Sequence, residues 1–130
     1  MIVVDASVLA EILLAMPEGP TLETRVFDTP DELHAPHVVD VEVAHVVRRY
    51  AAHGAISAER GRGALADLVS LPLRRHPHDF LLPRAWEMRH NISAYDAMYV
   101  ALAEILDVPL LTRDRRLAAA SGHRARIEVV

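Results

Sequence analysis

Four acidic residues, far apart in the chain, have the types and positions expected of ligands for a divalent cation. Asp5 and Asp114 each follow a short apolar run, Glu42 lies among valines, and Asp96 falls in the first turn of a predicted helix. Carboxylate oxygens are the ligands that Mg²⁺ and Mn²⁺ prefer. These residues therefore indicate metal-assisted chemistry, provided that the fold brings them together.

Each carboxylate also has a purely structural explanation. Asp5 and Asp114 could cap the helices that follow them, because aspartate is a preferred N-cap residue. Ser93 and Asp96 match a capping box, and Asp96 also complements the helix dipole. For any one of the three aspartates, capping alone is the better interpretation. Glu42 differs, because a carboxylate among valines is costly unless it is paired or reaches water.

The four residues are more informative as a set. In a parallel sheet, Asp5 and Asp114 would lie at the same edge if their strands were neighbours, and the amino ends of helices open there too. Two carboxylates about 5 Å apart repel by roughly 3 kcal/mol at an effective dielectric constant near 20. A divalent cation would remove that repulsion, and an all-oxygen ligand set favours magnesium or manganese over zinc.

The elements that must position these residues alternate between strand and helix. Strands are predicted at 1–4, 32–35, 73–76, 110–112 and 127–130, and helices at 8–13, 21–27, 38–50, 57–71, 79–90, 93–106 and 116–120. This alternation predicts an α/β fold in which helices cover both faces of a parallel sheet. With 130 residues, we expect a single domain spanning 1–130.

Composition narrows the chemistry further. The chain has no cysteine, which excludes disulfides and thiolate catalysis and suits a reducing cytoplasm. All 14 basic residues are arginine, so a P-loop lysine and a Schiff base are excluded as well. The net charge of −4 means that any nucleic acid would have to be bound by local basic clusters. We expect neither a signal peptide nor a membrane span.

At the acidic positions the chain resembles the PIN domains, in particular the VapC-type ribonuclease toxins of bacterial toxin–antitoxin pairs. The matching segments follow one another along the whole chain: Val4–Ser7, Pro36–Val43, Asn91–Glu104 and Leu111–Leu117. The segment Asn91–Glu104 is the most specific of these. The resemblance implies a three-layer α/β/α sandwich around a parallel sheet of about five strands.

The resemblance also implies roles for individual residues. It implies Asp5, Glu42, Asp96 and Asp114 as the catalytic quartet, with one or two Mg²⁺ or Mn²⁺ ions. The three aspartates would lie nearest the metal, and Glu42 would act through water or a second ion.

Further residues would support the quartet or bind the substrate. Ser7 and Thr112 are plausible supporting hydroxyls, and Asn91 would support the turn before the helix at 93–106. Arg113, Arg115 and Arg116 flank Asp114 and could contact RNA phosphates. Solvated surface charges or antitoxin contacts explain these arginines equally well.

The expected activity is that of a metal-dependent endoribonuclease that hydrolyses RNA phosphodiester bonds and leaves a 5′-phosphate. As a VapBC-type toxin, it would be a cytoplasmic homodimer that binds a VapB-like antitoxin. The alternative is a non-catalytic PIN-like module that binds RNA or a partner, although the complete quartet argues against it. A phosphatase or receiver-type protein with Asp5 as nucleophile is less consistent with the sequence, because Ser7 replaces the second aspartate and lysine is absent.

The remaining polar and aromatic residues have ordinary interpretations. The eight histidines are predicted to be scattered over the surface. Trp86, Tyr95 and Tyr99 are predicted to be core or dimer contacts rather than base-stacking platforms. The pairs 48–49 and 74–75, all arginine, are more distant candidates for phosphate contacts, although surface charges or antitoxin contacts explain them better.

Overall fold

Five parallel strands form the centre of the computed structural model, which describes residues 1–28 and 30–130. The strands are β1 (Ile2–Val4), β2 (Leu33–Pro36), β3 (Leu73–His76), β4 (Leu110–Thr112) and β5 (Ile127–Val129). The helices are α1 (Ala6–Leu13), α2 (Gly19–Phe27), α3 (Val38–Ala52), α4 (Ala58–Ser70), the 3₁₀ turn η1 (Asp79–Leu81), α5 (Leu82–Glu87), α6 (Ala94–Leu106) and α7 (Arg115–Ala119).

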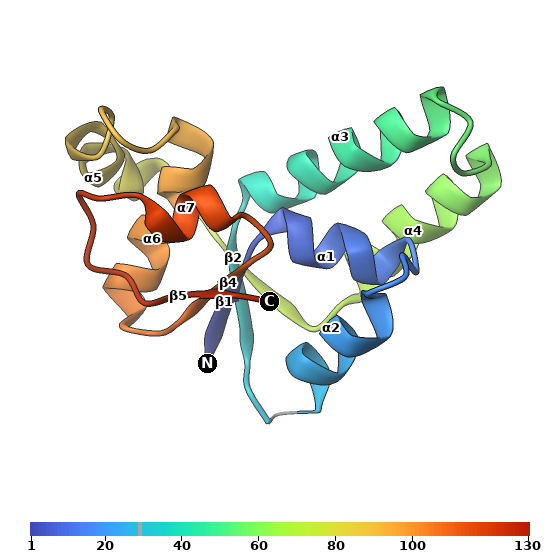
Figure 1. Ribbon diagram of the computed structural model, residues 1–130, viewed down its shortest axis with the longest axis horizontal. Helices are drawn as coiled ribbons and strands as arrows, with labels where there is room; N and C mark the ends of the chain where they lie inside the picture. Colours follow the sequence, from blue (N-terminus) through green and yellow to red (C-terminus); the bar gives the residue numbers. More distant parts are fainter. Residues whose placement is uncertain (29) are drawn as a thin grey trace.

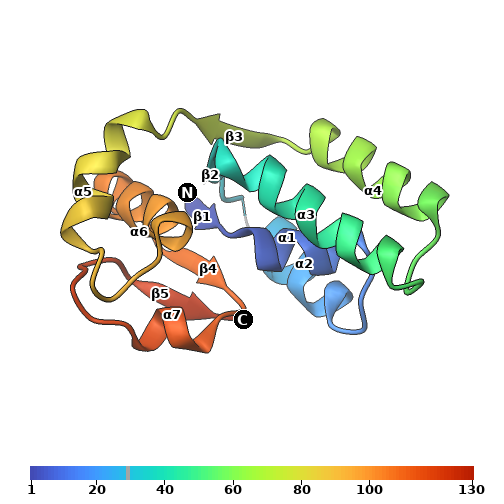
Figure 2. The same cartoon turned by 90° about the horizontal axis from the view of Figure 1, so that it is seen from above.

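The winding of the chain produces three layers. The strand order is β3-β2-β1-β4-β5, so the chain first moves outward from β1 to β3 and then crosses back to β4 and β5. Helices α1 to α4 cover one face of the sheet and α5 to α7 cover the other (Figures 1 and 2). The predicted α/β/α sandwich is therefore confirmed. The order reverses between β1 and β4, and in open α/β sheets ligands bind beyond the carboxyl ends of strands at such a switch point.

The central strands and α6 form the core. Every residue of β1, β2 and β4 is buried, as expected for parallel strands that helices cover on both faces. In α6, all seven residues from Ala97 to Ala103 are buried, so this helix is apolar nearly all the way round. The helix packs against β1, β2 and β4, which fixes the position of its amino-terminal turn above the sheet.

The long helix predicted over 79–90 is wrong in its extent. The structure divides this segment into η1 and α5, and α5 ends at Glu87. Pro83 lies in the first turn of α5, where the missing amide hydrogen is tolerated, whereas inside a longer helix it would break a hydrogen bond.

Two of the histidines predicted to be scattered surface residues form a pair instead, in which His34 is buried and His76 is partly buried. His34 of β2 is only 2% exposed, and its Nδ1 lies 2.8 Å from Nε2 of His76 in β3. The rings stack, with centroids 5.1 Å apart. Burial, and then the neighbouring His34, lowers the pKa of His76, which favours the neutral imidazole of His76 in this contact.

An ion pair joins α5 to α6. Arg84 donates from Nε and Nη2 to the carboxylate of Glu104, at 2.8 and 3.0 Å. The side chain of Glu104 is 6% exposed, and it also accepts from the amide of Arg124. Arg84 further donates to the carbonyl of Gly122. The pair thereby ties α6 to the segment that leads into β5.

Candidate metal and catalytic site

Asp5 lies at the carboxyl end of β1, where it begins α1. Its side chain is buried, 7% exposed, and accepts from the amide of Ser7, which caps the helix. It also accepts from the hydroxyls of Ser7 and Thr112. Burial raises the pKa of Asp5 despite these hydrogen bonds, because removal from water disfavours the charged form.

Two hydroxyls link Asp5 to the end of the neighbouring strand β4. Thr112 Oγ1 accepts from the amide of Asp114 at 3.0 Å, and Ser7 Oγ accepts from the amide of Arg113 at 3.1 Å. Because an amide can only donate, each hydroxyl must direct its own hydrogen to Asp5. The structure thus places Ser7 and Thr112 where they fix both the Asp5 carboxylate and the chain that carries Asp114.

Glu42 projects from α3 and is held by a tyrosine. The hydroxyl of Tyr99 in α6 donates to Glu42 Oε1 at 2.7 Å. Burial raises the pKa of Glu42, and the charges of Asp5 and Asp96 add to the effect. Tyr99 itself is 1% exposed, and burial raises its pKa too, followed by the charge of Glu42. Tyr99 therefore remains a neutral donor that orients Glu42.

Asp96 and Asp114 come from the starts of two further helices. Ser93 caps α6 by accepting from the Asp96 amide, and Asp114 caps α7 by accepting from the amides of Arg116 and Leu117. The capping interpretation is thus correct for Asp5 and Asp114. For Asp96, burial raises the pKa of the carboxyl group, and Asp5 and Asp114 raise it further.

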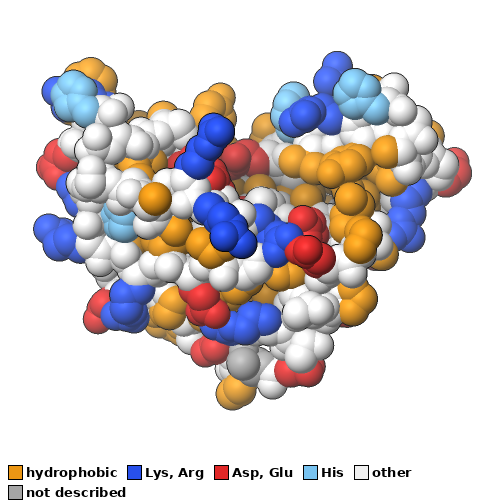
Figure 3. Space-filling model, in the orientation of Figure 1, with side chains coloured by type: hydrophobic (Ala, Val, Ile, Leu, Met, Phe, Trp, Pro, Cys, Tyr) orange, Lys and Arg blue, Asp and Glu red, His pale blue; other side chains and the backbone are white. Residues whose placement is uncertain are grey.

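One pocket of about 570 Å³ brings all four carboxylates together. It is lined by Asp5, Glu42, Asp96 and Asp114, together with Ser7, His45, Tyr95, Tyr99 and apolar neighbours. Figure 3 shows acidic side chains at the bottom of a hollow in the upper edge of the molecule. An aspartate can therefore cap a helix and also line the acidic pocket, because α1, α6 and α7 all begin at the edge where β1 and β4 end.

The donor set fits a hydrated Mg²⁺ or Mn²⁺ ion. Among residues 1–28 and 30–130, no three His, Asp or Glu side chains are grouped closely enough to hold an ion between them. Mg²⁺ commonly binds through one or two carboxylates and keeps several waters. Burial raises the pKa values of Glu42 and Asp96, and repulsion from neighbouring carboxylates raises them further. A bound cation would relieve that repulsion.

Not every residue expected at the site lies there. Asn91 is exposed, does not line the pocket, and instead has its side-chain amide close to Gly122. Arg113 pairs with Glu11 and Glu18 and donates to the carbonyl of Val130, so its guanidinium is occupied inside the protein. A contact between Arg113 and an RNA phosphate would have to compete with these contacts, and it stays a prediction. Arg115 and Arg116 are exposed.

Of the three aromatic residues predicted to be core or dimer contacts, only Tyr99 lies in the core. Tyr99 is a core residue as expected, but its contact with Glu42 was not foreseen. A signal existed, because Asp96 and Tyr99 are three residues apart and so share one face of the helix. Tyr95 is 63% exposed and lines the acidic pocket. Trp86 is 67% exposed, which rules out a core role.

The fold and this pocket agree with the similarity of the chain to known proteins. The chain belongs to the PIN-domain family, whose family model matches residues 2–122. Among curated relatives, Ribonuclease VapC12 of Mycobacterium tuberculosis is 41% identical over 130 residues, 100% of this chain and 99% of the relative. Ribonuclease VapC1 of the same organism is 50% identical over 98 residues, 75% of this chain and 74% of the relative.

Solved structures share the fold at lower sequence identity. The sarcin-ricin loop cleaving toxin VapC20 of Mycobacterium tuberculosis superimposes with a TM-score of 0.73 at 20% identity, covering 92% of this chain and 94% of that one. VapBC2 from Rickettsia felis, bound to a promoter DNA fragment, gives 0.69 at 12% identity, with 99% and 98% covered. Among the residues that the structure describes, no helix combines the length and apolar character needed to cross a bilayer.

Proposed function

We propose that this protein is a metal-dependent endoribonuclease of the VapC type, acting as the toxin of a toxin–antitoxin pair. The observation that carries the proposal is the convergence of four carboxylates, from four distant segments, on one pocket at the switch point of the sheet. Curated relatives named ribonucleases that match the whole chain support RNA as the substrate. We expect the protein to act in the cytoplasm, where RNA is available.

In the proposed chemistry, the three aspartates and Glu42 have different roles. Asp5, Asp96 and Asp114 would bind one or two Mg²⁺ or Mn²⁺ ions, directly or through water, and Glu42 would contribute through water or a second ion. The bound ion would polarise the phosphoryl oxygens and lower the pKa of its water. Glu42, whose pKa is raised by burial, is suited to accept a proton from the attacking water, because a general base is most effective when its pKa approaches the working pH.

The direct test of this function is cleavage of RNA by the purified protein. Total RNA should yield discrete new ends when Mg²⁺ or Mn²⁺ is present and none when a chelator is added. Sequencing those ends would identify the substrate and show whether each cut leaves a 5′-phosphate. Intact RNA under every metal condition would contradict the proposal.

Binding of metal to the isolated protein should raise its free energy of unfolding and its melting temperature. At metal concentrations ten times the dissociation constant, the gain is about 1.4 kcal/mol, or about 5 °C in melting temperature. Because Asp5, Glu42 and Asp96 have raised pKa values, they retain protons to higher pH than usual. Protons then compete with metal, so we expect a smaller shift near pH 5 than near pH 8, measured by thermal unfolding.

The matched control for this measurement is Asp96→Asn, which keeps the shape of the side chain and the Ser93 cap but removes one charge. Its metal-free form should be at least as stable as the parent, and its metal-induced shift should be smaller. An equal shift in both proteins would mean that the ion binds elsewhere.

The proposed partners are a VapB-type antitoxin and a second copy of the chain. The antitoxin is proposed because the relatives carry the VapC name and one similar structure is a VapBC assembly. Homodimerisation is supported by three apolar side chains that are at least half exposed, Phe80, Leu82 and Trp86, on η1 and α5.

Replacing Trp86 with serine is expected to weaken the dimer at least about thirtyfold, because a buried interface tryptophan typically contributes 2 kcal/mol or more. The folded monomer should lose little stability, since Trp86 is 67% exposed. Light scattering over a dilution series measures the dimer dissociation constant. Val69→Ser on α4 is the matched control, because Val69 is 77% exposed on the other face of the sheet; an equal loss in both variants would argue against an α5 interface.

A further inference from the structure

One face of α3 extends from the acidic pocket to the far end of the helix. Glu42 and Val46 line the acidic pocket, and Val46, Arg49, Tyr50 and His53 line a second pocket. Spacings of three, four and seven residues place these side chains on one side of a helix. This face of α3 presents the carboxylate of Glu42 near its amino end and the cationic and aromatic side chains of Arg49 and Tyr50 near its carboxyl end.

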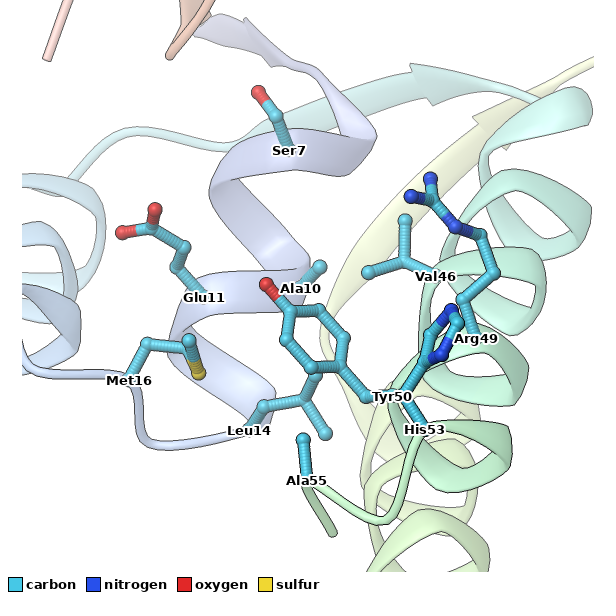
Figure 4. A pocket seen from close by; sticks show the side chains of 10 residues that line it. All are labelled: Ser7, Ala10, Glu11, Leu14, Met16, Val46, Arg49, Tyr50, His53 and Ala55. Carbon is cyan, nitrogen blue, oxygen red and sulfur yellow. The ribbon is translucent and has the colours of Figure 1, made fainter.

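The second pocket adjoins the first. It has a volume of about 470 Å³, lies between α1 and α3, and shares Ser7 and Val46 with the acidic pocket. Figure 4 shows Tyr50 reaching from α3 toward Ala10 of α1, with Arg49 beside it on α3. In Figure 3, an apolar strip lies directly below Arg and His side chains on this part of the surface. The two pockets therefore lie next to each other between α1 and α3.

The charges in the second pocket favour an anion. Its one carboxylate, Glu11, is already paired with Arg113. Within the part of the chain that the structure describes, no carboxylate pairs with Arg49. The second pocket therefore offers the unpaired guanidinium of Arg49 and the aromatic ring of Tyr50. Proteins bind single-stranded nucleic acids with this combination, because the cation contacts a phosphate and the ring stacks on a base.

We infer that this second pocket binds the nucleotides adjacent to the scissile phosphate, with Arg49 contacting a phosphate and Tyr50 supporting a base. The inference rests on the proposed ribonuclease function and adds substrate-binding residues to it. At 1.5 Å per residue, Arg49 lies about 10 Å along α3 from Glu42. That distance corresponds to at most about three nucleotides of a stacked strand, so one RNA strand can occupy both pockets.

The test compares two neighbouring arginines in the Asp114→Asn background, which is designed to bind RNA without cutting it. Arg49→Gln should weaken binding of a short single-stranded RNA about tenfold and reduce the dependence of log K on log salt by about 0.7. Arg48→Gln is the matched control, because Arg48 is exposed and lines neither pocket. Tyr50→Leu should weaken binding about tenfold without changing the salt slope, with its unfolding midpoint measured alongside.

The outcomes separate this inference from the proposed function. If the parent protein cleaves RNA but Arg49→Gln binds RNA as Arg48→Gln does, the inference is overturned and the ribonuclease proposal stands. If Arg49→Gln weakens binding of a protein partner and leaves RNA affinity unchanged, the pocket is a protein-docking site and the inference is also overturned. If the parent cleaves no RNA, the proposed function itself fails.

Discussion

Replacing Asp114 with asparagine is expected to abolish RNA cleavage while leaving the metal-free protein as stable as before, or more stable. Loss of a metal-binding carboxylate removes several kcal/mol of transition-state stabilisation, which corresponds to about a thousandfold in rate. Stability is retained because asparagine caps a helix as well as aspartate does, so Arg116 and Leu117 keep their acceptor. Cleavage rates and chemical unfolding curves of the two purified proteins measure both effects.

Asp114→Ala separates the two roles of this residue. It should lose the same activity and also about 1 kcal/mol of stability, because alanine cannot accept the capping hydrogen bonds. An Asp114→Asn protein that still cleaves RNA at the parental rate would show that capping is the whole role of Asp114.

Replacing Glu104 with glutamine is expected to produce the largest loss of stability, about 3 kcal/mol. Removing the buried partner of an ion pair is strongly destabilising. Arg84 is bound to Glu104 through two donors and would keep only the exposed Glu87 as a counter-charge. A loss of this size lowers the melting temperature by roughly 10 °C. Glu87→Gln is the matched control: Glu87 also accepts from Arg84, but it is 65% exposed, so its loss should cost less than about 1 kcal/mol.

The pH dependence of the Glu104 effect has a definite sign. The hydrogen bonds from Arg84, followed by the Arg124 amide and the arginine charges, lower the pKa of Glu104 in the folded protein. A lowered carboxyl pKa stabilises the fold above the unfolded value of about 4.3, and this contribution disappears as the pH falls through the folded pKa. The difference between parent and Glu104→Gln should therefore be full at neutral pH and shrink below about pH 4; a difference that grows in acid would contradict the ion-pair explanation.

The sheet and its layers were predictable because their signals are local. Apolar runs such as Ile2–Val4 and Leu110–Thr112 mark buried strands, and strict alternation with helices implies parallel pairing. The meeting of Asp5 and Asp114 was predictable for a related reason, since both residues follow strands and such strand ends meet at one edge. Where the local pattern was ambiguous, as around Pro83, the predicted helix was too long.

The contacts that adjust the site were not predictable from local patterns. The partners Tyr99 and Glu42 are 57 residues apart, and only the packing of α6 against the sheet brings the hydroxyl to the carboxylate. Arg113 adjoins Asp114 in sequence, yet its backbone direction leads the guanidinium to Glu11 and Glu18. His34 and His76 become a pair only through the register of β2 against β3. In each case the decisive information is long-range geometry.

The central strands β1 and β4 have only three residues each. They should therefore tolerate insertions and deletions less well than the edge of the sheet at β3. A shift of β4 by a single position would exchange the faces of its side chains and present the methyl groups of Leu111 to Asp5 in place of the Thr112 hydroxyl. One-residue insertions or deletions in β4 should therefore inactivate the protein. By contrast, the exposed turn at Pro72, where the chain enters β3, should accept an added residue or a fluorescent label without loss of cleavage.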